Sequence, residues 1–138
     1  MIIDAKDLLL GRMGSYVAKQ AMLGHKVDII NCSEAVISGS KQTIIAEYKQ
    51  MYARGIPAKG PFHHAVPSKL VRRSIRGMLP YKKDRGREAY KNIHCHNGAP
   101  STIQDQKVET LAKAHMGKLP YLKFMRVKDL CVQLGARQ

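Results

Sequence analysis

The first 31 residues contain two β-rich runs separated by a helical pattern, and this arrangement restricts the fold more than any other feature. Residues 1–4 predict a short strand, residues 11–23 an amphipathic helix, and residues 27–31 a buried strand. Gly24 and His25 close the helix. A strand, a helix and a strand within this length form a βαβ unit, and its crossover should be right-handed. We therefore expect the two strands to belong to one parallel sheet.

Later segments continue this alternation of helices and strands. A second amphipathic helix follows Ser40, a suitable N-terminal cap, and its apolar positions recur with a 3.6-residue period. These positions are Ile44, Ile45, Tyr48, Met51 and Tyr52. Residues 93–96 and 121–126 predict further strands, whereas the pattern of residues 108–116 fits either a helix or a strand. Residues 127–134 predict a terminal helix that ends at a glycine.

The alternation predicts an α/β sandwich with a small, mostly parallel sheet, formed by residues 1–138 as a single domain. Such a domain buries a stable core without metal or disulfides, and the three cysteines form no CxxC motif, a pattern typical of a reducing cytosol. The longest apolar run has about four residues, too few for a membrane span. The N-terminus also lacks the pattern of a signal peptide. We therefore expect a soluble, cytoplasmic protein with no membrane partner.

Most of the excess positive charge lies in residues 54–91. This segment contains eleven lysines and arginines and two acids, so its local charge of +9 is most of the net charge of +14. Like charges at this density oppose compaction. The segment therefore indicates a polyanionic partner, and a phosphate backbone fits best. Residues 53–67 contain three prolines and two glycines and predict an extended loop.

Residues 68–78 predict a helix with two different faces. Pro67 precedes Ser68, which is the expected N-cap. Cations recur at i, i+3, i+4 and i+7 along one face, at Lys69, Arg72, Arg73 and Arg76. Apolar side chains take the opposite face, at Val71, Ile75, Met78 and Leu79. A solvated helix normally mixes charge signs to gain i,i+4 pairs, so an acid-free cationic face predicts contact with RNA or DNA.

A second basic turn, residues 81–87, leads into a short helix that reaches about residue 91. Tyr81 lies among these cations and is a candidate to stack on bases, whereas Tyr48 and Tyr52 are expected in the core. Arginines should contact phosphates bidentately, and lysines should act as point charges. The residues predicted to bind RNA are Arg12, Arg54, Lys59, His63, His64, Lys69, Arg72, Arg73, Arg76, Lys82, Lys83, Arg85 and Arg87.

Two other patterns have competing interpretations. Residues 10–15 (LGRMGS) open a helix, where amides attract anions, but no GxGxxG or GxxxxGK[ST] motif is present. The glycines are better explained by close helix packing. Arg12 in the first helical turn is unfavourable for the helix dipole, which an external phosphate would explain. His94 and His96 resemble metal ligands, but no further ligand cluster is near them, so contact with solvent or RNA is favoured and no metal site is expected.

Catalysis has little support in the sequence. The ten acids are isolated, with no pair suited to general acid and base roles and no nucleophile elbow. We therefore expect no catalytic residues, no cofactor and no small-molecule substrate. An RNA-modifying or nucleotide-using enzyme would need a cofactor loop or an acid pair, and neither is found. A free translational repressor that binds messenger RNA remains an alternative.

Several motifs resemble the L-thirteen family of large-subunit ribosomal proteins, in its archaeal and eukaryotic branch. The segment around residues 76–80 (RGMLP) is the most specific, and the resemblance is weakest over residues 101–118. The other matching motifs are Gly60-Pro61-Phe62-His63, Pro67-Ser68, Arg73, Arg85-Gly86, Gly98-Ala99-Pro100, Ile3-Asp4-Ala5, Leu10-Gly11-Arg12 and Val36-Ile37-Ser38-Gly39.

The resemblance implies a three-layer α/β/α sandwich with a long basic loop and helix inserted in it. It also implies a structural constituent of the large ribosomal subunit that binds large-subunit rRNA directly, supports early subunit assembly and has neighbouring ribosomal proteins as partners. The long C-terminal helical extension common in eukaryotic members is absent, which favours an archaeal-type member. On this interpretation the chain is located in the ribosome and is not an enzyme.

Overall fold

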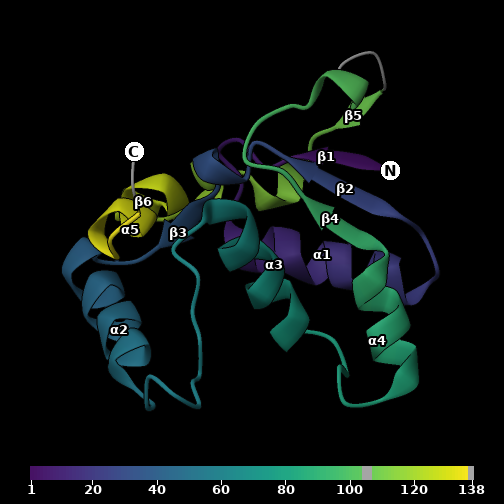
Figure 1. Cartoon of the computed structure of the whole chain (residues 1–138). Coiled ribbons are helices and arrows are strands. Elements are labelled where there is room, and N and C mark those ends of the chain that lie inside the picture. Colours follow the sequence, from purple (N-terminus) through teal and green to yellow (C-terminus); the bar gives the residue numbers. More distant parts are fainter. Residues whose placement is uncertain (104–106, 137–138) are drawn as a thin grey trace.

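The computed structural model describes residues 1–103 and 107–136 of the chain, and its centre is a four-stranded parallel sheet (Figure 1). The strand order is β4-β2-β1-β5, with each neighbouring pair parallel. Strands β1 (Ile2–Asp4) and β2 (Val27–Ile30) pair in the register Ile3 to Ile29. The predicted α/β class with a small, mostly parallel sheet is confirmed.

The N-terminal βαβ unit forms as predicted. Helix α1 (Leu10–Met22) joins β1 to β2, and it ends where Gly24 adopts a φ of 93°, a conformation that glycine enters without steric cost. Its buried face includes Met13 and Val17, which are fully buried. The prediction that a glycine allows close helix packing is confirmed for Gly14, where a Cβ would lie 3.0 Å from the Met78 sulfur, but Gly11 faces open space.

Strand β4 (Ile93–Cys95) lies beside β2, so the third predicted strand is also confirmed. Residues 108–116, whose pattern fitted either a helix or a strand, begin with β5 (Val108–Glu109), which pairs with β1 at the edge of the sheet. A short 3-10 turn follows at Ala112–Ala114. Helices α1, α3 (Pro67–Gly77) and α4 (Asp84–Lys91) lie together along one face of the sheet (Figure 1).

The core lies between this sheet and these helices and extends to the last helix of the chain. Its largest fully buried side chains come from strands, helices and the loop after β1, and they are Ile3, Leu8, Met13, Ile29, Ile75, Ile93 and Leu130. Burying such a side chain contributes roughly 1.5–3 kcal/mol. Val71 and Ile75 therefore anchor α3 firmly to this core, and the side chains on the other face of α3 are held on a rigid support.

A second, two-stranded sheet carries the remaining helices. Strand β3 (Val36–Ser38) pairs antiparallel with β6 (Phe124–Arg126), and α2 (Lys41–Ala53) and α5 (Val127–Gln133) follow them directly in the chain. The strand predicted within residues 121–126 is confirmed, and so is the terminal helix. Strand β3 was not predicted.

Arg126 at the end of β6 joins this second sheet to the start of the chain. Its guanidinium group forms ion pairs with Asp7, at 3.2 Å, and with Glu34. Each of the three side chains is about one-third exposed or less, so solvent screens these pairs less than it screens surface ones. The contact holds β6 and α5 beside the loop that leaves β1.

Two predicted details of the helix ends differ from the structure. Ser68 was expected to cap α3, but Val66 occupies the cap position and Pro67 the first helical position, because the fixed φ of proline suits that place. Ser40 does lie at the cap position of α2, without a side-chain capping bond. Met78 was expected on the buried face and is instead 42% exposed, since it follows the end of the helix and covers Gly14 from outside.

Candidate nucleic-acid interface

Helix α3 presents a row of cations away from the core, as predicted. Val71 and Ile75 are fully buried against the sheet, so positions on the opposite side of the helix face outward. That side carries the four cations that we call the α3 ridge, Lys69, Arg72, Arg73 and Arg76. Lys69 is exposed, and the three arginines are half-buried by neighbouring side chains.

Aromatic rings hold two of these arginines in place. The Arg72 guanidinium lies 4.5 Å from the centre of the Tyr90 ring, and it donates a long hydrogen bond of 3.5 Å to the Tyr90 carbonyl. Arg76 lies 5.2 Å from the centre of the Tyr81 ring. Each cation–π contact contributes about 0.5–1 kcal/mol at such partly exposed sites. The guanidinium groups therefore lose less conformational freedom when they bind an anion.

The loop from residue 54 to residue 66 runs between α2 and α3 and is tied to both (Figure 1). From α2, the Tyr52 hydroxyl donates a hydrogen bond of 2.8 Å to the His64 carbonyl. From α3, Arg73 donates one of 2.9 Å to the Phe62 carbonyl. These ties position the two histidines that were predicted to contact RNA, with His64 exposed and His63 half-buried.

The tip of this loop is a closed turn that carries two more predicted cations. The backbones of Ile56 and Gly60 exchange hydrogen bonds of 2.8 and 3.2 Å. Gly55 has a φ of 98°, and a Cβ there would overlap the Gly60 carbonyl, so the turn requires glycine. Arg54 and Lys59 are exposed at this tip.

The second basic turn and α4 carry the remaining cations of the segment. Lys82, Lys83, Arg85 and Arg87 are all exposed there. Tyr81 packs edge-on against Tyr90 with 5.4 Å between ring centres, which joins this turn to the α3 ridge. Among the residues that the structure describes, the only salt bridge inside residues 54–91 is Arg87 to Asp84 at 2.6 Å, and both side chains are largely exposed. Such a surface pair is worth little, so the segment stays strongly cationic.

Gly86 fixes how the basic turn meets α4, and its replacement should be destabilising. A Cβ at Gly86 would overlap the Pro80 carbonyl, whereas one at Gly77 would meet nothing within 4 Å. We expect Gly86→Ala to lower the free energy of unfolding by about 2 kcal/mol, because the backbone around Pro80 must move to make room for the new Cβ. Gly77→Ala is the matched control and should raise it by about 0.5 kcal/mol. Urea unfolding followed by circular dichroism measures both, and equal effects would contradict this packing.

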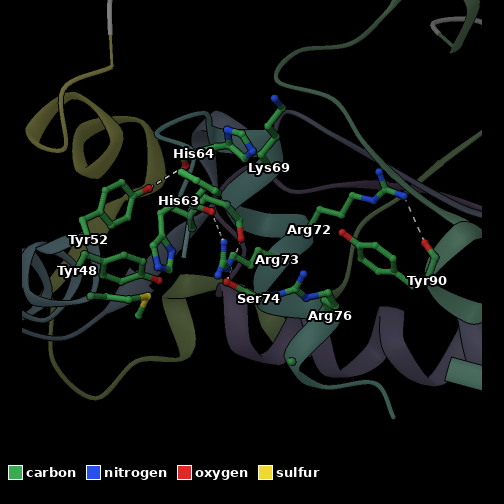
Figure 2. A pocket seen from close by; sticks show the side chains of 14 residues that line it. Tyr48, Tyr52, His63, His64, Lys69, Arg72, Arg73, Ser74, Arg76 and Tyr90 are labelled. Atoms are coloured by element: carbon green, nitrogen blue, oxygen red, sulfur yellow. Dashed lines mark hydrogen bonds between the residues drawn. The ribbon is translucent and has the colours of Figure 1, made fainter. Parts of the chain in front are cut away.

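A groove of about 560 Å³ lies between α2, the loop and α3 (Figure 2). Tyr48 and Tyr52 enter it from α2, Arg73 and Arg76 from α3, and the His63 ring lies between the two sets (Figure 2). The remaining lining residues are Met51, Phe62, His64, Lys69, Leu70, Arg72, Ser74, Gly77 and Tyr90. Among these described lining residues none is acidic, so the groove favours anions.

Burial favours the neutral form of three rings in the groove, those of His63, Tyr48 and Tyr52. Burial, then Arg73 and His64, lower the pKa of His63 below its usual value. Burial raises the pKa of Tyr48 and of Tyr52, so both keep their hydroxyl protons. Tyr48 and Tyr52 were predicted as core residues. Tyr48 is partly buried and packs against the core, but the prediction is wrong for Tyr52, which lines the groove and stacks on His63 with ring centres 5.0 Å apart.

The other predicted sites lie apart from the groove. Arg12 is exposed in the first turn of α1, close to the place where Ser15 contacts Met78 at the end of α3. His94 is exposed, and His96 lies 3.6 Å from Asp28. In residues 1–103 and 107–136, no three histidine, cysteine or acidic side chains converge as a metal site requires. None of the described helices is long and apolar enough to cross a membrane.

Comparisons with known proteins agree on one family. The family model described as Ribosomal protein L13 matches residues 1–102. The large ribosomal subunit protein uL13 of Methanopyrus kandleri is 40% identical over 136 residues, which cover 97% of this chain and 86% of that protein. The proteins of the same name from Methanosarcina barkeri and Archaeoglobus fulgidus are 38% and 34% identical, and each alignment covers 99% of this chain and 98% or 88% of the relative. The resemblance to the L-thirteen family is therefore confirmed, and the chain belongs to the ribosomal protein L13 family.

Proposed function

We propose that this chain is a structural constituent of the large ribosomal subunit that binds large-subunit rRNA directly and supports early subunit assembly. It does so as a single domain in which residues 54–91 form the RNA-binding segment. As a member of a family of ribosomal proteins, it is a structural protein located in the ribosome and not an enzyme. Its partners are large-subunit rRNA and neighbouring ribosomal proteins.

The observation that carries this proposal is the α3 ridge. Lys69, Arg72, Arg73 and Arg76 share one face, the opposite face is buried in the core, and no described acid in residues 54–91 pairs with them. Packed RNA strands repel one another, and cations on a rigid support neutralise that repulsion. A protein that places them between strands favours the folded RNA, which is how this chain would act early in assembly.

The relatives named above support the choice of partner. Each is named as a protein of the large ribosomal subunit, and the alignments span nearly the whole of this chain, including the basic segment. The guanidinium groups suit phosphates because they present a planar fork of donors. Recognition of the RNA would depend on its shape and on any unpaired bases near the loop.

Sedimentation of a cell lysate tests this proposal. We expect the chain to travel with the large subunit through a sucrose gradient and to remain bound after a moderate salt wash. An immunoblot across the fractions detects the chain. A cytosolic enzyme, which should stay at the top of the gradient, is the control. Recovery of the chain only in ribosome-free fractions would contradict the proposal.

A further inference from the structure

The groove between α2 and α3 has a property that phosphate binding does not require. Cations alone suffice for a phosphate backbone, yet this groove is also lined by six aromatic rings, those of Tyr48, Tyr52, Phe62, His63, His64 and Tyr90. Phe62 is 63% exposed and Met51 is 40% exposed. Apolar side chains left open to water beside guanidinium groups are typical of a binding site.

The aromatic wall of the groove is already built in the isolated chain. The Tyr52 and His63 rings are stacked, with centres 5.0 Å apart and planes 27° from parallel. The bonds from Tyr52 to the His64 carbonyl and from Arg73 to the Phe62 carbonyl hold this stack between the two helices. His63 is neutral at pH 7, since burial, and after it the Arg73 guanidinium, lower its pKa. It therefore offers a flat ring face rather than another charge.

Phosphate-binding groups lie directly beside this wall. Arg73 donates a hydrogen bond from one Nη atom to the Phe62 carbonyl, and its guanidinium group carries further N–H donors. Arg76 packs over Tyr81 on the same side of the helix. Figure 2 shows the stacked rings on the α2 side and these arginines on the α3 side of one groove. A flat, neutral surface beside fixed cations matches a nucleotide, which joins an aromatic base to a phosphate.

We propose that this groove holds one unpaired nucleotide of large-subunit rRNA. The base stacks on the wall formed by Phe62, His63 and Tyr52, and the adjoining phosphates lie on Arg73 and Arg76. Only an unpaired base can enter, because a paired base is enclosed by its stacked neighbours. The inference rests on the proposed function and deepens it, since it identifies where the protein meets a base rather than a backbone. The carboxylates of an acidic peptide would satisfy the cations but leave the stacked rings unused.

The test uses the full chain and a transcript of large-subunit rRNA. The variant Phe62→Ala with His63→Ala removes two of the three rings of the wall and leaves every lysine and arginine. We expect its affinity to fall roughly 10- to 100-fold, the usual effect of losing base stacking, with an unchanged slope of log affinity against log salt. Base-specific probing with dimethyl sulfate and carbodiimide should show an unpaired nucleotide that the wild type protects and this variant does not.

Three controls separate stacking from loop order. Tyr121→Ala removes an aromatic ring that is 75% exposed outside the groove, and it should change neither affinity nor protection. Tyr52→Phe removes the bond to the His64 carbonyl but keeps the ring, so protection should persist. His63→Phe should also retain protection, because phenylalanine supplies a comparable flat face.

The outcomes distinguish a nucleotide site, a contact with a protein neighbour and failure of the proposed function. Suppose that the wild type binds with the expected salt dependence and that the wall variant equals Tyr121→Ala in affinity and protection. This result overturns the nucleotide site and leaves the proposed function intact. The same binding result, combined with loss of the wall variant from assembled subunits, would assign the groove to a protein neighbour instead. Failure of the wild type to bind the rRNA at all would count against the proposed function itself.

Discussion

Replacement of Lys69 and Arg76 by glutamate should weaken binding to large-subunit rRNA by roughly 100- to 1,000-fold at 100 mM salt. Each phosphate contact contributes close to one power of the salt concentration to the affinity, so loss of two contacts alone costs about 50-fold, and the two new negative charges repel the backbone further. Filter binding to a labelled transcript measures this. The fold should persist, because Lys69 is exposed and the half-buried Arg76 packs over the Tyr81 ring outside the hydrophobic core.

A variant with the same change in net charge provides the control. Lys19 and Lys26 are exposed at the far end of α1 and beside β2, outside the basic segment. Lys19→Glu with Lys26→Glu should weaken binding less than about 10-fold, through long-range charge alone. Equal losses in the two double variants would mean that total charge, and not the α3 ridge, determines affinity. Matching circular dichroism spectra of both variants and the wild type exclude unfolding as the cause.

The wild-type chain should lose about three to four decades of rRNA affinity between 50 and 200 mM salt. This estimate assumes that the cations of residues 54–91 neutralise about eight phosphates. Each neutralised phosphate releases condensed counterions, which makes binding depend on salt. Equilibrium titrations at four or five salt concentrations give the slope directly. In the Lys69→Glu and Arg76→Glu double variant, the magnitude of that slope should fall by about 1.5 to 2.

A nearly flat salt dependence would show that binding is not driven by phosphate contacts. Replacing chloride with glutamate as the anion is a useful control, because competition by anions for the protein would change the slope without changing the number of phosphates engaged. Together, the slope and the two double variants assign the affinity to particular cations.

The parts of the fold that sequence predicts well are those with strong local periodicity. The βαβ unit and α3 follow from apolar residues spaced for one buried face, such as Val71 and Ile75, and the structure buries those residues. Strand β3 (Val36–Ser38) was missed because it has only three residues, and its pairing with the predicted strand at Phe124–Arg126 was therefore missed as well. So short a run gives no alternation to detect, and its partner is determined by tertiary contacts.

The cations of the candidate site were predicted, but the aromatic groove was not. Charge density is visible in sequence without knowledge of the fold. The stacking of Tyr52 on His63, by contrast, depends on how the loop returns across α2. The helical spacing of Tyr48 and Tyr52 indicated a buried face, yet only Ile44 of α2 is fully buried, because Tyr48, Met51 and Tyr52 border the groove. The presence of two tyrosines one turn apart, directly before a basic loop, was the available signal.

The order of strands in the two sheets has a consequence for synthesis of the chain. β1 is made first, but one of its two neighbours, β5, begins at Val108, and β3 waits for β6 at Phe124–Arg126. Both pairings link distant parts of the sequence, which slows folding. The domain can therefore complete its fold only after nearly all of the chain has left the exit tunnel. Residues 54–91 emerge before the two sheets that support them are complete.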